Sequence, residues 1–83
     1  MIKISKHTKL DPNEIINIAS RYFGKKGEGL IENERSTCIP CFIKFEGGGG
    51  YVSISIYDDE SQRKVDVEAR EYEYLAKEFL YKL

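Results

Sequence analysis

The sequence has few of the residues on which catalytic and metal-binding chemistry depends. Histidine occurs once, at His7, and cysteine twice, at Cys38 and Cys41. A catalytic histidine needs a partner that fixes its tautomer and a nucleophile within reach. No such constellation can be named around His7, so we expect it at the surface. A structural zinc site needs four ligands, and one cysteine pair supplies half of them. These shortages favour a function without enzymatic chemistry.

Long hydrophobic runs and a strong net charge are also missing. No apolar run approaches the ~20 residues that span a bilayer. Met1–Lys6 lacks the apolar region and the cleavage site of a secretory signal. The sequence therefore predicts a cytoplasmic chain with no membrane partner and with reduced thiols. The formal net charge of −1 gives no overall attraction to nucleic acid.

Charge is nevertheless distributed unevenly along the chain. Residues 1–27 carry six basic and two acidic side chains, whereas residues 28–83 carry seven and twelve. Such asymmetry can mark a basic binding patch. Lysines at a helix end and on solvated faces are the simpler explanation.

The 83 residues are enough for one domain, which we place at 1–83. Two segments have the spacing of amphipathic helices. The first is predicted at 12–24, with Asp11 as N-cap, Glu14 completing a capping box and Gly24 as a left-handed terminator. The second is predicted from about Arg70 to Lys82, without a capping residue at its start.

The remaining segments alternate between apolar and polar residues, as half-buried strands do. Strands are predicted at 1–6, 39–46, 51–57 and 63–69, and a poorly patterned edge strand at 30–37. Gly47–Gly50 predicts a hairpin connection, because glycine tolerates positive φ. A phosphate-binding loop would require a helix after the glycines, and a strand follows them. Residues 58–62 are predicted to form a turn.

The expected order is β-α-β-β-β-β-α, which indicates an α+β fold of two layers. An antiparallel sheet of four to five strands would carry both helices on one face. This order resembles the layout of the TATA-box-binding (TBP-like) and helix-grip folds over the whole chain. The resemblance lies in element order, so it implies a fold and no site.

Cys38-Ile39-Pro40-Cys41 is the one segment with the spacing of a reactive thiol or metal pair. A redox pair of the thioredoxin kind opens a helix, which lowers the thiol pKa. Here a strand pattern follows instead. The favoured interpretation is that Cys41 is a small core residue. The alternatives are metal binding by Cys38 and Cys41, with zinc as the metal, and thiol redox chemistry.

The strand at 51–57 predicts the candidate binding face. If Val52, Ile54 and Ile56 point to the helices, their neighbours point away from them. The predicted binding face is Tyr51, Ser53, Ser55, Tyr57 and Lys64. Its occupant could be a protein, including a second copy of the chain, because tyrosine suits protein interfaces. Single-stranded nucleic acid is the weaker alternative, since acids share the face and oppose phosphate.

The leading hypothesis is therefore a small non-enzymatic interaction module, in homodimeric form or bound to another protein. The second is a protein that depends on Cys38 and Cys41 for metal or thiol chemistry. The third is small-ligand binding between helices and sheet, in a cavity lined by Tyr22, Phe23 and Phe79.

Overall fold

The computed structural model of the chain describes residues 1–36 and 41–83. In chain order its elements are β1 (Ile2–Thr8), α1 (Pro12–Phe23), β2 (Ile31–Ser36), β3 (Cys41–Gly47), β4 (Gly50–Asp59), β5 (Gln62–Arg70) and α2 (Glu73–Tyr81). The strands form one antiparallel sheet in the order β1-β5-β4-β3-β2. The predicted α+β class and element order are confirmed.

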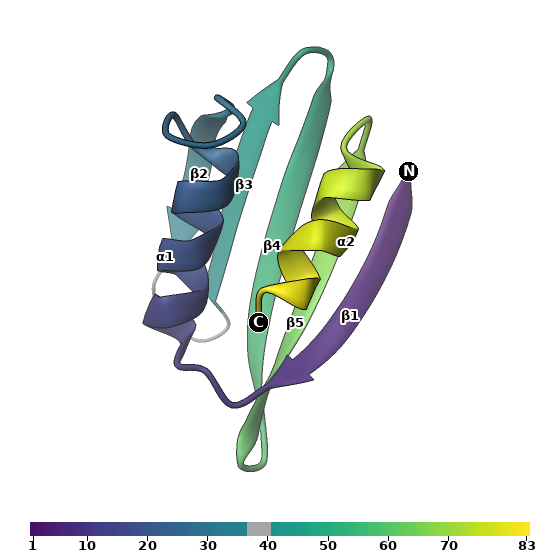
Figure 1. The fold of residues 1–83 in the computed structure, drawn as a ribbon. Helices are drawn as coiled ribbons and strands as arrows, with labels where there is room; N and C mark the ends of the chain where they lie inside the picture. Colours follow the sequence, from purple (N-terminus) through teal and green to yellow (C-terminus); the bar gives the residue numbers. More distant parts are fainter. Residues whose placement is uncertain (37–40) are drawn as a thin grey trace.

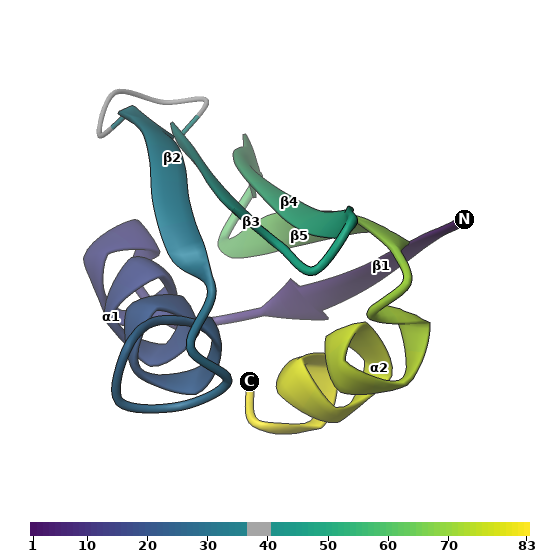
Figure 2. The ribbon, with the colours of Figure 1, turned by 90° about the horizontal axis from the view of Figure 1, so that it is seen from above.

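Both helices cover the same face of the sheet (Figures 1 and 2). Helix α1 packs on β3, and α2 packs on β5 and β1. Val52, Ile54 and Ile56 are completely buried between the layers, as the alternation predicted. The other completely buried residues are Ile15, Ala19, Phe23, Ile43, Val65, Val67, Ala69, Ala76 and Phe79. The opposite face of the sheet carries no helix, so the polar members of each strand face solvent.

Aromatic rings join the two helices to the sheet. The ring centroid of Phe23 lies 5.4 Å from that of Phe79 and 5.6 Å from that of Phe45. Tyr22 meets Phe23 edge to face at 4.9 Å. These separations fall in the favourable range for aromatic pairs. One cluster therefore holds α1, α2 and β3 together.

Helix α1 begins and ends differently from the prediction. Asp11 has the extended backbone of an N-cap, but its side chain makes no cap hydrogen bond. Gly24 is not left-handed, since its φ is −75°, and positive φ occurs later, at Gly29. The turn after the helix explains this difference. The amides of Glu28 and Leu30 donate to the carbonyls of Tyr22 and Phe23, so no left-handed residue is needed at Gly24.

Helix α2 begins three residues later than the predicted Arg70. Strand β5 continues to Arg70 because its backbone still pairs with Tyr51 of β4. Glu71 then adopts a φ of 71°, which breaks the strand before the helix can start. Tyr72 stands at the N-cap without a side-chain cap, and its hydroxyl donates to the Gly47 carbonyl. Pairing with the preceding strand β4 therefore overrides the local helical spacing.

Both predicted hairpins form, with tighter turns than expected. Gly47 pairs with Gly50, and only Gly48 and Gly49 turn the chain, with φ of 58° and 84°. Positive φ at both positions is the geometry of a two-residue hairpin turn. At the second hairpin the ladder runs to Asp59 and Gln62, so most of the predicted 58–62 turn is strand.

The two edges of the sheet differ in regularity. Strand β2 occupies one edge, as predicted, and its register shifts between Glu32 and Glu34. Strand β1 occupies the other edge and pairs with β5 in seven consecutive positions without a shift. It runs two residues beyond the predicted end at Lys6, because Thr8 is buried and still pairs with Arg63. Thr37 and the predicted strand start at residues 39–40 lie outside the described residues.

Candidate functional site

The side chains on the helix-free side of the sheet form what we call the outer face. Register places Ser5, Asp66, Ser55 and Phe42 in one row across β1, β5, β4 and β3. The outer face comprises Lys3, Ser5, His7, Ile31, Glu34, Ser36, Phe42, Lys44, Glu46, Tyr51, Ser53, Ser55, Tyr57, Asp59, Lys64, Asp66, Glu68 and Arg70. The five residues of the predicted binding face therefore lie together. Phe42 is the aromatic member that the sequence interpretation left out.

The centre of the outer face is hollowed. A depression of about 90 Å³ is lined by Lys3, Ser53, Ser55, Tyr57, Asp66 and Glu68. It forms because the two serines are short and lie between larger neighbours on the adjacent strands. Tyr57 stands at its edge with 41% of its surface exposed. The face thus offers a small polar hollow and a projecting aromatic ring side by side.

Polar groups of the outer face are paired with one another. The Tyr51 hydroxyl donates to Glu68 Oε2 at 2.6 Å, and the Ser5 hydroxyl donates to Asp66 Oδ1 at 2.6 Å. Lys44 Nζ lies 5.1 Å from the Tyr51 ring centroid, within the range of a cation–π contact. The acids that would repel a phosphate are therefore held in the middle of the face.

The Tyr51–Glu68 hydrogen bond has a testable consequence at alkaline pH. The bond to Glu68 raises the pKa of Tyr51 above its ordinary value of 10. A tyrosine whose pKa is higher in the folded state than in the unfolded state stabilises the fold at pH values below its unfolded-state pKa. This stabilisation is lost as the pH rises through the folded-state pKa. We expect the Glu68→Gln variant to move the Tyr51 pKa back toward 10.

Tyrosinate absorbance followed by pH titration measures this shift, and the difference between each protein and its Tyr51→Phe derivative isolates Tyr51. A Tyr51 titration that is the same in the parent and in Glu68→Gln would contradict the role given to the hydrogen bond. Glu60→Gln, in the exposed β4–β5 turn, serves as the matched control and should leave the titration unchanged.

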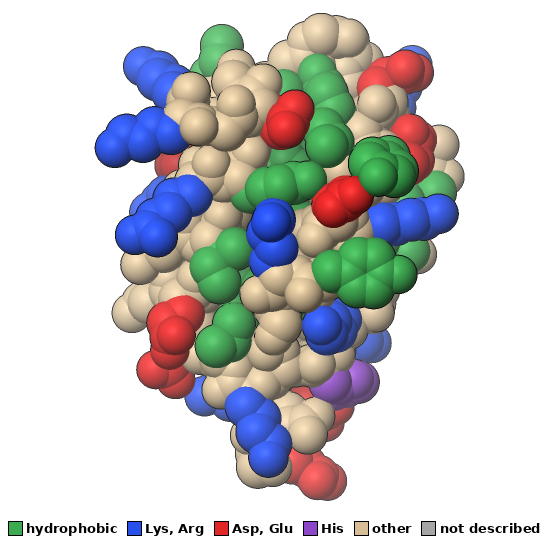
Figure 3. All heavy atoms as spheres, viewed as in Figure 1, with side chains coloured by type: hydrophobic (Ala, Val, Ile, Leu, Met, Phe, Trp, Pro, Cys, Tyr) green, Lys and Arg blue, Asp and Glu red, His purple; other side chains and the backbone are tan. Residues whose placement is uncertain are grey.

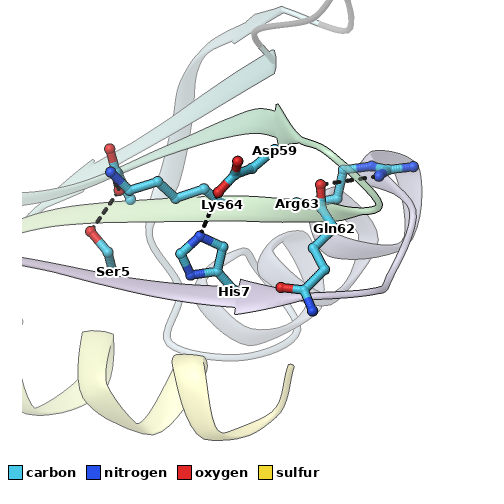
Figure 4. Close-up of polar contacts among 7 residues, drawn as sticks. Ser5, His7, Asp59, Gln62, Arg63 and Lys64 are labelled. Carbon is cyan, nitrogen blue, oxygen red and sulfur yellow. Dashed lines mark hydrogen bonds and ion pairs between the residues drawn. The ribbon is translucent and has the colours of Figure 1, made fainter.

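His7 lies at the surface, as expected, and it has a partner that the sequence did not indicate. Its Nε2 is 2.8 Å from Asp59 Oδ2, and both side chains are about half exposed. Figure 4 shows the His7 ring pointing to Asp59 beside Lys64. An exposed ion pair of this kind contributes little free energy. The two residues are 52 positions apart in the sequence. They meet because β1 pairs with β5 and β5 pairs with β4.

The structure describes one half of the predicted cysteine pair. Cys41 is 1% exposed and points into the core, opposite Ile56 of β4. Its interpretation as a core residue is confirmed. Cys38 lies outside the described residues. Within residues 1–36 and 41–83, no group of three potential metal-ligating side chains occurs. Metal or redox chemistry at Cys38 and Cys41 stays a prediction.

The residues named for a ligand cavity pack against one another. Tyr22, Phe23 and Phe79 have ring centroids 4.9 to 6.4 Å apart, so a ligand at this position would have to separate them. A larger hollow, of about 410 Å³, opens at the surface between α1 and β2. It is lined by Ser20, Gly24, Lys25, Leu30, Ile31, Glu32 and Phe45. Small-ligand binding stays a prediction, and the sequence did not indicate this second position because residues 30–37 were poorly patterned.

The outer face and the helices carry no sequence motif that names a function. The outer face has two tyrosines, as a stacking platform would, but it lacks the pattern of an RNA-recognition sheet.

In the described part of the chain, neither helix has the length and apolar character to cross a membrane. Comparison with protein-family models, with curated proteins and with solved structures finds no match for this chain.

Proposed function

We propose that this chain is a small, non-enzymatic interaction module of the cytoplasm that pairs with a second copy of itself through the outer face. The observation that carries the proposal is the position of Tyr57 beside the hollow at Ser53 and Ser55. A two-fold interface places the same patch on both partners, so the patch must contain both a projection and a recess. Tyr57 of each copy would lie over the serines of the other.

The charge of the outer face supports a second copy over other occupants. Its bases are Lys3, Lys44, Lys64 and Arg70, and its acids are Glu34, Glu46, Asp59, Asp66 and Glu68. Charges of both signs let a rotated copy place bases opposite acids. A phosphate backbone would gain from the lysines and lose to the acids, so nucleic acid is disfavoured.

The size of the outer face predicts a weak dimer. Five strands about 4.8 Å apart and seven residues at about 3.4 Å each give a face of roughly 570 Å² per copy. The total of roughly 1,140 Å² lies in the range of weak, transient interfaces. We therefore expect dimers that dissociate on dilution, in the micromolar range or weaker.

Sedimentation equilibrium over rising protein concentration tests the proposal. The parent chain is expected to shift from monomer to dimer. Ser55→Arg places a long side chain in the hollow and should weaken dimerisation at least about tenfold, because it would fill the recess that Tyr57 of the other copy needs. Ser61→Arg, in the exposed β4–β5 turn, makes the same chemical change away from the face and should leave dimerisation unchanged.

A parent chain that remains monomeric at about 1 mM would rule out the dimer. Equal dimerisation of the parent and Ser55→Arg would place the interface elsewhere and would also overturn the proposal. Circular dichroism of each variant establishes that the fold is kept.

A further inference from the structure

The edge strand β1 is open to pairing with another strand. Within the described part of the chain, β1 pairs with β5 alone, and its other side faces away from the sheet. The opposite edge, β2, is protected by its register shift and by charged residues, which are common devices against strand addition. Strand β1 also carries charged residues, Lys3 and Lys6, but it is regular over seven residues and has no register shift. It is therefore the edge at which an added strand would find an unbroken row of backbone groups.

A hollow with an apolar base lies beside this edge. It measures about 240 Å³ and is lined by Ile4, Ser5, Lys6, Lys77, Leu80 and Tyr81. Figures 1 and 2 show β1 and α2 next to each other, and Figure 3 shows hydrophobic, basic and acidic side chains side by side over α2. Tyr81 lines the rim of the hollow and is 84% exposed.

The wall of the hollow is tied to β1 and does not have to be assembled on binding. Lys6 Nζ donates to the Leu80 carbonyl at 3.0 Å, and the Thr8 hydroxyl donates to the Leu83 carbonyl at 3.2 Å. The end of α2 is thus anchored to the edge strand by side chains of that strand. Such preorganisation lowers the conformational cost of binding.

Lysines predominate at this edge. Residues 1–10 contain Lys3, Lys6 and Lys9 and no acid, and Lys77 lines the hollow from α2. Three acids of the neighbouring elements contact groups of residues 1–7. Asp66 accepts from Ser5, Asp59 contacts His7, and Glu73 contacts the amino terminus at 3.2 Å. The edge therefore suits an acidic partner.

We propose that β1 binds an extended acidic segment of another protein as an added sixth strand, with one apolar side chain of that segment seated in the hollow between β1 and α2. Main-chain hydrogen bonds to the edge would supply affinity, and the hollow and lysines would supply specificity. This site is separate from the outer face and goes beyond the proposed dimer.

A second copy of the chain is a poor occupant of this edge. In an antiparallel pair centred on Ser5, Lys3 of one copy would lie opposite His7 of the other. Because the strand contains no acid, no register of β1 against itself forms a cross-strand ion pair. In registers that set Lys3 or Lys6 opposite a lysine of the other copy, like charges would also destabilise the strand pair. An acidic strand would place carboxylates opposite the lysines of β1, and opposite charges stabilise a strand pair.

The register of β1 defines the probe. In an antiparallel complex, the peptide Thr-Glu-Glu-Thr-Val-Glu-Val runs from opposite Thr8 to opposite Ile2. It places glutamates opposite His7, Lys6 and Lys3, and a valine opposite Ile4 beside the hollow. Facing residues share a side of the sheet, so this valine points toward α2. The control peptide replaces each glutamate with lysine and keeps the apolar residues. A second control replaces the central threonine with proline, which removes a ladder donor.

Titration of the parent chain with each peptide, followed by NMR of the backbone amides, tests the proposal. The acidic peptide is expected to shift the β1 amides and to slow their exchange with solvent. The lysine and proline peptides should bind at least about tenfold more weakly. Raising the salt concentration from about 50 to about 500 mM should weaken binding of the acidic peptide, because salt screens the attraction between exposed charges.

Protein variants locate the site. Lys77→Glu should lower the affinity for the acidic peptide about fivefold, since it reverses a partly exposed charge beside the hollow. Lys26→Glu, in the exposed turn after α1, is the matched control and should bind as the parent does. Tyr57→Arg, which changes the outer face, should also bind as the parent does, so failure of the dimer and failure of this site are distinguishable.

Three outcomes would overturn the proposal. They are no binding of the acidic peptide at millimolar concentration, equal binding of the proline peptide, and amide shifts confined to the outer face. Formation of dimers through β1 in the absence of peptide would equally assign the edge to a second copy.

Discussion

Replacing Phe79 with alanine is expected to lower the free energy of unfolding by about 4 kcal/mol. Phe79 is completely buried, and its ring contacts Tyr22 and Phe23 of the other helix. Truncation removes apolar contacts and leaves a cavity that the surrounding strands cannot fill, because they are fixed by their ladders. A chain of 83 residues is expected to have a total stability of about 4 to 12 kcal/mol. The variant should therefore lose between about one third and all of the stability of the parent.

Urea denaturation followed by circular dichroism measures the change. Tyr74→Ala is the matched control, because it removes an aromatic ring from the same helix at a position that is 72% exposed. We expect that variant to stay within about 0.5 kcal/mol of the parent. Similar losses for Phe79→Ala and Tyr74→Ala would contradict the placement of Phe79 at the junction of the helices and the sheet.

The second large effect is expected at Gly50, where alanine should cost about 3 kcal/mol. A Cβ at this position would overlap the carbonyl oxygen of Arg70 and would lie 2.6 Å from Glu71 Cβ. Both neighbours belong to the segment that links β5 to α2, so relief of the overlap requires movement of backbone. The cost here arises from close approach and does not depend on backbone conformation.

Gly49→Ala is the informative comparison for Gly50→Ala. Gly49 has a φ of 84° in the hairpin turn, but nothing lies within 4 Å of the added Cβ. The strain of a left-handed residue is expected to cost roughly 1 kcal/mol. Denaturation of both variants should show the larger loss at Gly50. The reverse order would mean that β4 and the start of α2 are farther apart than the structure has them.

The alternation of β4 was the most reliable sequence signal. Val52, Ile54 and Ile56 recur at every second position, and a strand with one buried face must follow that period. The same period identified the outer face, including Tyr51 and Tyr57. It could not show the hollow at the serines, because the hollow depends on the size of side chains on β5 and β1.

The helix ends were less predictable. Gly24 follows the apolar residues of α1, and glycine is the residue that commonly ends a helix with positive φ. In this chain, however, positive φ occurs at Gly29. The residues at 70–72 likewise fit a helix by spacing, yet Arg70 is the last residue of β5. In each case hydrogen bonds to other backbone segments decide where the helix stops or starts, and sequence spacing does not contain that information.

The sequence by itself determined the kinds of elements, their order and the side of each central strand that is buried, because these properties follow from local periodicity. Only the tertiary structure decided that β1 lies next to β5 at an open edge, that α2 forms a wall beside it, and that His7 meets Asp59. These contacts join residues more than fifty positions apart. Their formation depends on the free energy of packing the whole sheet against two helices, which no short segment specifies.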